Sequence, residues 1–598
     1  MAASSAAAIP TKRIVTELFA MVKPWRKWLI LIAFLVLATS LLELVPPLLI
    51  RSIIDNHLTV ARREGLLSLA LLYLAATASV QAITASNGYL VATVAQKLLY
   101  TIRVRLFSHL QRLPMTYYDH TPLGDIISRA TADVETIDVV FTSGVSTLVA
   151  NLFRLVTVAI AMLIMSPILS IAAVIVVPPL AIITRYFQVR IRQAEQANRR
   201  AIGLMNTHLQ ESLRGMEVIQ SFRKENAFIT RFRHVLRAVL NANNSSTKFS
   251  ALYPPVTAIL SALAVAFLLW AGTRDFLAGF GISVGTLTAF VLLLQQFIAP
   301  VTALGDEWQT VQGALSGAER ILSVLTEPPD EVTEKPMDGK AKDNGGIVCQ
   351  DVVFGYLPDQ PVLQGMSLRV EPGEHVALVG RTGAGKTSLV HLLAGLYVPW
   401  SGSVTAAGQD PRSIPVDERR SVVGVVPQVL HLFSGTVLDN LTLKDPSVHE
   451  SAVKEAATLS GADAFIMGLP QGYQTKLSGV GRGSGTQLSS GQQQLLALAR
   501  ALVWKPEVLL LDEATSSVDG ASEAALRSSI RERVLKSGTA VLTVAHRLST
   551  ACEADRVIVI EAGRIIEEGS PAELAQRGGR FAALLELEAA GWDWRTIS

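Results

Sequence analysis

The sequence predicts two domains of different fold class: an all-α domain with six membrane-spanning helices, followed by a soluble α/β domain. Three observations predict this division. The chain has 598 residues, too many for one compact core. Half of the residues are hydrophobic and only 17% are charged, and the apolar excess lies before about Leu325. After that point a buried strand, a glycine-rich turn and a helix follow one another, as in α/β folds.

A change of composition marks the boundary between the two domains. Residues 326–346 are polar, contain three prolines and end in two glycines, which is typical of a linker. We therefore expect an N-terminal segment at 1–27, the membrane domain at 28–325, the soluble domain at 347–588 and a tail at 589–598.

Net charge and cysteine content narrow the class of protein. The formal net charge of +3 is too small to indicate a nucleic-acid partner, and none is expected. The two cysteines, Cys349 and Cys552, are far apart in the soluble domain and make no disulfide framework. They fit a reducing cytosol, as small buried side chains.

The N-terminal segment is expected to remain on the chain, in the cytosol or at the membrane surface. It lacks the basic-then-apolar order of a cleaved signal, and the first long apolar run begins near Trp28. Between Ile14 and Trp25 apolar residues recur at helical spacing beside basic ones, which indicates a helix lying on the membrane. The first turn of a spanning helix is the alternative.

Six apolar stretches are long enough to cross a membrane. A bilayer core requires about 20 apolar residues in a helix, because no water is available there to bind the peptide groups. The six stretches are residues 28–49, 66–89, 139–165, 169–187, 251–270 and 284–301. The third and fourth are separated only by a turn at Ser166 and Pro167, so we expect them to form a tight hairpin.

Two long polar segments, at 91–138 and 188–250, still show helical patterns and contain many arginines. The positive-inside rule places both in the cytosol. Continuing the second helix from Tyr89 to Leu113 extends it roughly 36 Å beyond its apolar run. Breaks near residues 117–120 and 215–226 predict two tips, and our hypothesis is that these contact the soluble domain. Ordinary solvated helix turns are the alternative.

Two charged residues interrupt the spans: Glu43 in the first and Arg154 in the third. Charged groups at membrane depth are costly unless they are paired or hydrated, so they usually face a cavity. Either these two residues pair with each other or they contact a bound molecule.

The glycine-rich turn of the soluble domain is a complete phosphate loop, Gly-Arg-Thr-Gly-Ala-Gly-Lys-Thr, between a buried strand at 375–379 and a helix. Its N–H groups and the helix N-terminus converge on phosphate oxygens, the lysine adds a cation and the final threonine binds Mg²⁺. The candidate ATP-binding residues are Gly380, Arg381, Thr382, Gly383, Ala384, Gly385, Lys386, Thr387 and Ser388.

A pair of acidic residues follows a second buried strand, Val-Leu-Leu-Leu at 508–511. At the end of that strand Asp512 is expected to hold Mg²⁺ through water, and Glu513 to polarise the attacking water as general base. Together with the phosphate loop, this pattern predicts Mg-ATP hydrolysis.

The sequence Leu-Ser-Ser-Gly-Gln at 488–492 is similar to the signature of ATP-binding cassette (ABC) proteins, an element that phosphate-loop kinases and GTPases lack. The order of the surrounding motifs agrees. From about Ile14 to about Glu588 the chain resembles a half-size ABC exporter of multidrug or lipid type, with its membrane domain first and its ATPase domain second.

The resemblance implies further site residues. Tyr356 matches the aromatic residue that stacks on adenine, and Gln428 matches the glutamine that contacts Mg²⁺ and the attacking water. His546 matches the histidine that contacts the γ-phosphate. The implied signature contacts to ATP on a second ATPase domain are Ser489, Gly491 and Gln492, and the implied loop between the two ATPase domains is at 516–519.

Three departures from the family pattern are visible. Ser490 replaces the usual glycine of the signature, and Arg482 stands where glutamate is usual, in a segment with one extra residue. The run Gln492-Gln-Gln494 resembles the corresponding run in family members that form heterodimers. Because Glu513 and His546 are intact, the chain is expected to be the hydrolysing subunit of such a pair or one of two equal subunits.

The resemblance implies a dimer in the cytoplasmic membrane, with ATPase domains in the cytosol, that exports or flips amphipathic or lipophilic small molecules, lipids or peptides. Uptake of an amphipathic or metal-chelate substrate is one alternative, and a membrane-anchored ATPase with a regulatory role is another. A soluble DNA-associated ATPase is excluded by the six spans. Candidate substrate contacts, or simply packing residues, along the sixth span are Gln295, Gln296, Glu307 and Trp308.

Overall fold

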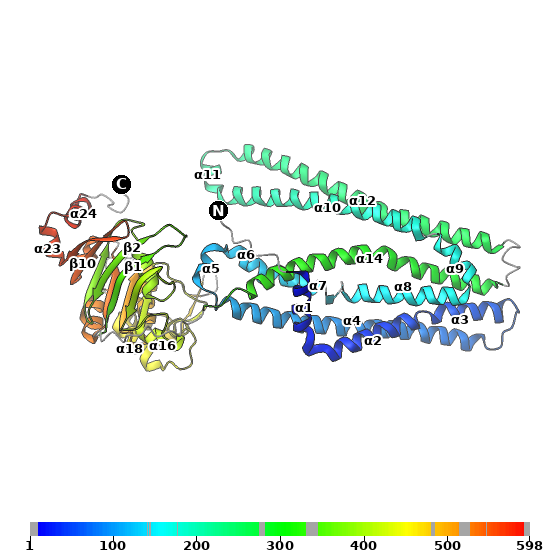
Figure 1. The fold of residues 1–598 in the computed structure, drawn as a ribbon, viewed down its shortest axis with the longest axis horizontal. Coiled ribbons are helices and arrows are strands. Elements are labelled where there is room, and N and C mark those ends of the chain that lie inside the picture. Colours follow the sequence, from blue (N-terminus) through cyan, green and yellow to red (C-terminus); the bar gives the residue numbers. More distant parts are fainter. Residues whose placement is uncertain are drawn as a thin grey trace. The chain divides into compact units, whose positions relative to one another are not determined.

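The computed structural model describes residues 10–139, 141–142, 145–175, 177–273, 282–330, 345–479, 485–512, 527–545 and 547–590. The chain divides into two compact units: Met1–Gln111 with Leu123–Glu327, and Arg112–Pro122 with Pro328–Ser598. The first unit is helical and the second contains the sheets (Figure 1). An all-α membrane domain followed by an α/β domain is therefore confirmed.

The first unit begins with a separate helix rather than with the first turn of a span. Helix α1 (Thr11–Val22) ends at the 3₁₀ turn η1 (Lys23–Trp25), which contains Pro24, and α2 (Arg26–Leu42) follows. The predicted first span is then divided, because α3 (Val45–Ile53) starts anew at two prolines whose nitrogens donate no hydrogen bond. Helix α3 passes into the π-helical turn η2 (Ile54–Leu58).

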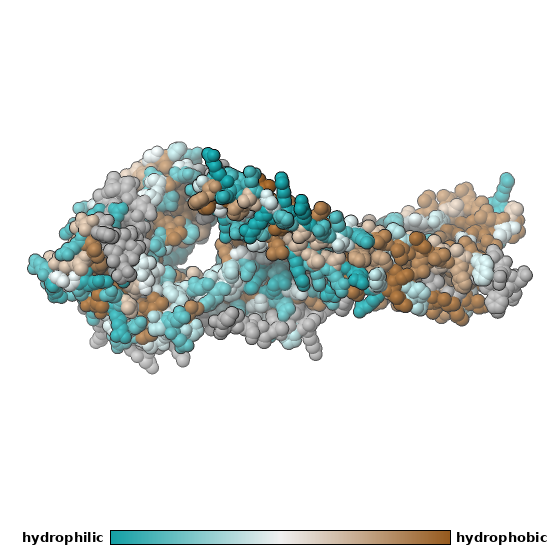
Figure 2. All heavy atoms as spheres, turned by 90° about the horizontal axis from the view of Figure 1, so that it is seen from above, coloured by the Kyte–Doolittle hydropathy of each residue, from teal (hydrophilic) through white to brown (hydrophobic). Residues whose placement is uncertain are grey.

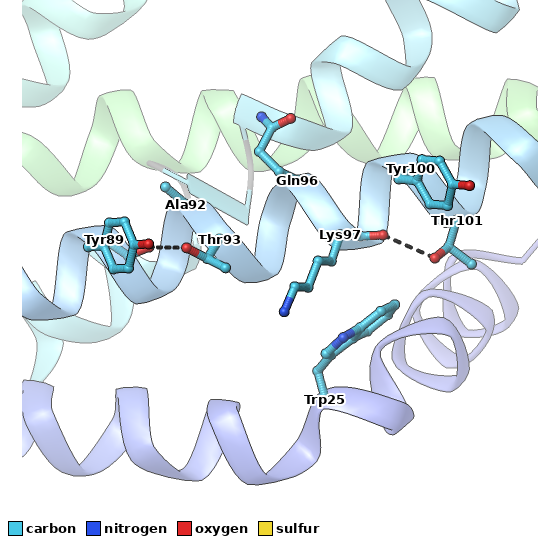
Figure 3. A pocket seen from close by; sticks show the side chains of 8 residues that line it. All are labelled: Trp25, Tyr89, Ala92, Thr93, Gln96, Lys97, Tyr100 and Thr101. Carbon is cyan, nitrogen blue, oxygen red and sulfur yellow. Dashed lines mark hydrogen bonds between the residues drawn. The ribbon is translucent and has the colours of Figure 1, made fainter.

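The second span continues far beyond its apolar part, as predicted. Helix α4 (Leu66–Leu110) is continuous over 45 residues and ends three residues before the expected Leu113. At Trp25 a surface groove of about 590 Å³ runs along α4, and Lys97 extends toward the indole ring (Figure 3). The Lys97 ammonium also lies 6.0 Å from the centre of the Trp28 ring. Tryptophan and lysine side chains of this kind are typical of a membrane–water interface.

Short helices connect α4 to the third span. They are α5 (Met115–His120), α6 (Leu123–Ser128), the π-turn η3 (Arg129–Asp133) and α7 (Val134–Val139). Helix α5 belongs to the second unit and the other three belong to the first. The third span is α8 (Val145–Met165), and α9 (Pro167–Val174) follows after the predicted turn, where the Ser166 hydroxyl accepts a hydrogen bond from the Leu169 N–H.

Five helices of the described residues are long and apolar enough to cross a membrane, and they match five of the six predicted spans. The fourth predicted span is shared between α9 and α10 (Val177–Arg214), with a turn at Ile175. Two prolines, Pro178 and Pro179, favour a new helix start at this point.

Helices α10 and α12 (Glu225–Thr273) form an antiparallel pair joined by α11 (Met216–Ser221). Two side-chain hydrogen bonds tie the pair: Ser246 donates to Glu195 at 2.9 Å, and Tyr253 donates to Thr184 at 3.2 Å. Hydrophobic residues gather at the end of this unit that holds α9, whereas hydrophilic residues cover the part toward α11 (Figure 2). The apolar band marks the part of the helices that lies in the membrane.

Helix α14 (Val284–Leu325) is the central helix of the first unit and packs against α3, α7 and α8. Its buried face contributes Phe290, Leu293 and Leu294 to the core. At its other end, the Arg320 guanidinium donates two hydrogen bonds to the buried carboxylate of Asp133, at 2.8 and 2.5 Å. Helix α14 is thereby fixed to the segment that directly follows α5 and α6.

The second unit is built on two main sheets. A three-stranded antiparallel sheet has the order β2-β1-β4, and a six-stranded sheet has the order β11-β10-β3-β9-β8-β5, parallel except for the edge strand β11. The strands are β1 (Ile347–Phe354), β2 (Leu363–Val370), β3 (His375–Val379), β4 (Ser401–Ala406), β5 (Val423–Val426), β8 (Val508–Asp512), β9 (Ala540–Val544), β10 (Arg556–Glu561) and β11 (Arg564–Gly569); β6 (Gly435–Thr436) pairs with β7 (Lys476–Leu477).

Helices cover the parallel sheet, so its central strands are buried along their whole length. The helices and turns are α15 (Lys386–Leu393), α16 (Val416–Val422), α17 (Val437–Thr442), α18 (Glu450–Ser460), α19 (Asp463–Met467), η5 (Gly472–Gln474), α20 (Ser490–Leu502), η6 (Ile530–Val534), η7 (Leu535–Ser537), α22 (Leu548–Ala551), α23 (Pro571–Gln576) and α24 (Arg580–Ala589). The carboxyl ends of β3, β8 and β5 meet at one sheet edge, where ligands of such folds bind.

Candidate functional site

The phosphate loop lies between β3 and α15, as the sequence predicts. Gly385 has φ 100°, a conformation that side-chain-bearing residues rarely adopt, and a Cβ there would stand 2.6 Å from Leu363 Cδ2. Glycine is therefore required at this position by both backbone and space. The exposed Thr382 and Gly383 form the outer part of the loop, while Ala384 and Gly385 lie inside.

Lys386 is held at the centre of the loop. Its ammonium donates hydrogen bonds to the carbonyl oxygens of Gly380, at 2.7 Å, and of Arg381, at 2.9 Å. The residue is only 9% exposed. A largely buried ammonium that donates to neutral carbonyl groups of its own loop can also bind phosphate oxygens. These carry a negative charge and are therefore stronger acceptors than carbonyl oxygens.

Two of the three predicted Mg²⁺ ligands, Thr387 and Asp512, lie together. The Thr387 hydroxyl donates to Asp512 Oδ1 at 3.2 Å, although the two residues are 125 positions apart in the chain. Asp512 is 3% exposed at the end of β8, two strands from β3 in the sheet. Both donors are oxygen atoms, which fits Mg²⁺, an ion that keeps several waters and takes few protein ligands.

Gln428 follows β5, which pairs with β8 through Val426 and Leu511, so it leaves the sheet at the same edge as Asp512. Its side chain is exposed. Glu513, His546 and the loop 516–519 lie outside the described residues. Their assigned roles therefore stay predictions.

Tyr356, the predicted adenine-stacking residue, is anchored beside the phosphate loop. Its hydroxyl donates to the Ser388 hydroxyl at 3.1 Å and lies 3.2 Å from His391 Nδ1. Burial raises the pKa of Tyr356 and lowers that of His391, so both side chains are neutral near pH 7. The tyrosine is still 37% exposed, which leaves part of an oriented aromatic ring available for stacking.

An aromatic residue that the sequence did not single out joins this site to α5. Tyr397 packs edge-on against Tyr356, with ring centres 5.4 Å apart, and stacks on His391. Its hydroxyl donates to Asp119 Oδ2 of α5 at 2.8 Å. The contact predicted for residues 117–120 with the soluble domain is thus confirmed. No motif marks Tyr397, because its role depends on a partner 278 residues away.

The contact of α5 borders a groove of about 650 Å³, whose lining includes Asp119 and His120 of α5 and Tyr356 and Trp400 of the sheet domain. The following linker closes the same region: the Asp330 N–H donates to the Arg112 carbonyl at 2.6 Å, and the Asp330 carboxylate pairs with Arg412. Helix α5 is thus bonded to the sheet domain through Asp119, and the segment just before it is bonded to the linker through Arg112.

The signature forms the N-terminus of α20. Ser489 caps the helix: its hydroxyl accepts from the Gln492 N–H at 3.2 Å, and the Gln492 side chain accepts from the Ser489 N–H at 3.0 Å. Gly491 is buried in the first turn. The N–H groups of this turn and the helix dipole favour an anion. Arg482, one of the departures from the family pattern, lies outside the described residues.

In the membrane domain the structure pairs the two charged residues of the spans. Arg154 Nε lies 3.0 Å from Glu43 Oε2. Gln295 and Gln296 line the same pocket as Arg154. The side chains of Glu307 and Trp308 lie outside the described residues.

Two family models match the chain: one described as "ABC transporter transmembrane region", at residues 29–301, and one described as "ABC transporter", at residues 363–516. The chain is 33% identical over 580 residues to the "Uncharacterized ABC transporter ATP-binding protein YknV" of Bacillus subtilis, covering 96% of this chain and 94% of the relative.

Two further relatives have names that mention substrates. A "Fatty acid ABC transporter ATP-binding/permease protein" of Mycobacterium bovis is 34% identical over 519 residues, which are 87% of this chain and 80% of the relative. A "Probable multidrug resistance ABC transporter ATP-binding/permease protein YheH" of Bacillus subtilis is 31% identical over 505 residues, 84% of this chain and 73% of the relative.

Proposed function

Because this chain belongs to the ABC transporter family, as a multi-pass membrane protein with an exporter-type membrane domain ahead of an ATPase domain, we propose that it is one half of an exporter or flippase for amphipathic or lipophilic molecules. The chain is an ATP-hydrolysing transporter. The observation that supports coupling of hydrolysis to transport is the hydrogen bond from Tyr397 to Asp119, since α5 connects α4 with α6 and the spans that follow.

At the nucleotide site each residue takes a role that its environment supports. The adenine stacks on Tyr356, and Lys386 neutralises the β- and γ-phosphates. Mg²⁺ would be held by Thr387 and Asp512, with Gln428 nearby, and would supply charge neutralisation for the phosphates when bound. Glu513 orients and deprotonates the attacking water as general base, while His546 contacts the γ-phosphate.

The functional unit that we propose is a dimer. The phosphate loop of one chain and the signature of a second chain enclose each ATP, with Ser489, Gly491 and Gln492 contributed in trans. Exposed apolar side chains on α11 support a second chain: Val218 is 60% exposed and Phe222 just beyond this helix is 72% exposed, away from the apolar band of the membrane domain. Such side chains favour burial against a partner.

Closure of the ATPase domains around ATP and their opening after hydrolysis would shift the membrane domain between two conformations. The names of the relatives, which mention fatty acids and multidrug resistance, support an amphipathic substrate. Membrane lipid then surrounds the transporter and is also one of the amphipathic molecules that we propose as substrates.

The test uses the full chain in liposomes, alone and together with a second half-size transporter chain. We expect Mg-ATP hydrolysis that amphipathic compounds stimulate, and ATP-dependent accumulation of a lipophilic dye in inside-out vesicles. Glu513→Gln is the control, which should still bind ATP but not hydrolyse it. Accumulation in right-side-out vesicles instead would overturn export, and hydrolysis indifferent to every amphipathic compound would overturn transport of this class.

A further inference from the structure

A pocket of about 340 Å³ in the membrane domain contains a charged side chain. Helices α3, α4, α8 and α14 each contribute to its wall. Most of the lining is apolar, including Pro47 and Leu292, and the polar groups are Tyr73, Arg154, Gln295 and Gln296. The pocket therefore combines a cation and two amides with an apolar wall, inside a membrane domain whose spans consist mostly of apolar residues.

The ion pair beside this pocket is asymmetric. Arg154 lines the pocket, whereas Glu43 does not. The Glu43 side chain is 19% exposed and the Arg154 side chain 31%. Glu43 is the C-terminal cap of α2, at the break that precedes the prolines of α3. Of the two members of the ion pair, only the cation therefore lines the pocket.

Two polar atoms at the site make no hydrogen bond to the described residues. They are Arg154 Nε, whose approach to Glu43 is close but poorly aligned for a hydrogen bond, and Gln296 Oε1. Buried polar groups without a partner are costly, above all in a membrane interior where water is scarce. Both side chains also line the pocket, where the guanidinium and the amide each carry N–H groups that can donate to a bound anionic group.

We infer that this pocket binds the anionic headgroup of an amphiphile, a carboxylate or a phosphate, with the alkyl chain along the apolar wall. The planar guanidinium of Arg154 is suited to a two-point bond with either group. A cationic headgroup would be repelled by Arg154, and a neutral one would form weaker hydrogen bonds with the guanidinium than an anion does. This inference names the substrate class of the proposed exporter and rests on that function.

Binding of a probe tests the inference without requiring ATP hydrolysis. The full chain in phosphatidylcholine nanodiscs is mixed with radiolabelled dodecanoate or with dodecyltrimethylammonium, which have chains of similar length and opposite headgroup charge. We expect dodecanoate to bind at least tenfold more tightly. Equal affinity for the two probes would overturn the inference, while ATP hydrolysis measured in the same nanodiscs tests the proposed function separately.

Variants assign the effect to the pocket. Arg154→Gln should weaken dodecanoate binding at least tenfold, Arg154→Lys should restore part of it, and Arg199→Gln, at a 78% exposed arginine of α10, is the matched control without effect. If Arg154→Gln fails to fold, Glu43→Gln decides: removing the counter-charge should strengthen dodecanoate binding several-fold, and unchanged or weaker binding would contradict the inference.

A competition experiment identifies the source of the anion. Phosphatidylglycerol added to the nanodiscs should compete with dodecanoate if the natural ligand is a bilayer lipid, whereas dodecyl phosphate should compete in either case. Failure of both to compete would overturn the assignment of a headgroup site.

Discussion

The Tyr397 hydroxyl donates a 2.8 Å hydrogen bond to the Asp119 carboxylate, and its ring packs against Tyr356 of the nucleotide site. Burial, together with the bond to Asp119, raises the pKa of Tyr397, so its hydroxyl remains a donor at physiological pH. One side chain therefore touches both the segment that connects two membrane helices and the residue proposed to stack on adenine.

Removing this hydrogen bond should uncouple substrate from hydrolysis. In Tyr397→Phe we expect basal ATP hydrolysis to be largely kept and its stimulation by amphipathic compounds to fall by about fivefold, the factor that corresponds to about 1 kcal/mol. The measurement is ATPase activity with and without compound in liposomes.

Tyr473→Phe is the matched control for this prediction. Tyr473 also donates to an aspartate, Asp463, at 2.6 Å, but within the ATPase domain and away from α5. The two variants should differ in stimulation. Equal loss in both would show that the α5 contact has no special role.

Lys386→Ala should lower the affinity for Mg-ATP. A hydrogen bond to a charged group contributes about 1.5–3 kcal/mol, which corresponds to at least about a tenfold change in dissociation constant. Fluorescent nucleotide titration measures it. Lys476→Ala, at an exposed lysine of β7, is expected to bind like the wild type, and tight binding by Lys386→Ala would refute the assigned site.

Two glycines of α14 should respond in opposite ways to alanine. A Cβ on Gly317 would lie 2.2 Å from the Thr136 hydroxyl, which is itself bonded to the Asp133 carbonyl, whereas nothing lies within 4 Å of a Cβ on Gly313. Gly317→Ala should cost about 1–3 kcal/mol by overpacking α14 against α7. Gly313→Ala should raise the free energy of unfolding by about 0.5–1 kcal/mol, because alanine has a higher helix propensity than glycine.

Thermal unfolding of the membrane domain in detergent, monitored by circular dichroism, checks both variants. If both raise or both lower the midpoint, the close packing of α14 on α7 does not contribute as described.

The ATPase domain should lose stability below about pH 6.5. Burial lowers the pKa of His375 from its ordinary value of 6.5, and its Nε2 lies 2.9 Å from the Thr543 hydroxyl. The unfolded chain then binds a proton that the folded chain does not, so the stabilising contribution is complete above the unfolded pKa and decreases as the pH falls through it.

The midpoint of unfolding measured between pH 5 and 8 tests this sign. His375→Gln, which does not titrate, should show a shallower fall on acidification than the wild type. An equally steep fall in both proteins would assign the pH dependence to other groups.

Several features could be predicted from the sequence because they depend on nearby residues or on a uniform solvent. The spans follow from the length of apolar run that a bilayer requires. The phosphate loop follows from its glycine-rich motif, in which Gly385 adopts a positive φ that other residues rarely take. The continuous helix from Tyr89 onward follows from the helical spacing of its apolar residues. The division of the fourth span between α9 and α10 was not predicted, although Pro178 and Pro179 were visible, because prolines are often tolerated inside spanning helices.

By itself the sequence determined the order of the two domains, the class of ATP-hydrolysing transporter and the family, since each depends on local patterns of residue type. Only the tertiary structure decided that Thr387 meets Asp512, that Tyr397 meets Asp119, and that Arg154 rather than Glu43 faces a pocket. These pairings depend on strand order and helix packing, which sum many weak contacts over the whole chain. No short segment specifies them, because each side chain meets its partner only when the helices or strands that contain the two residues pack together.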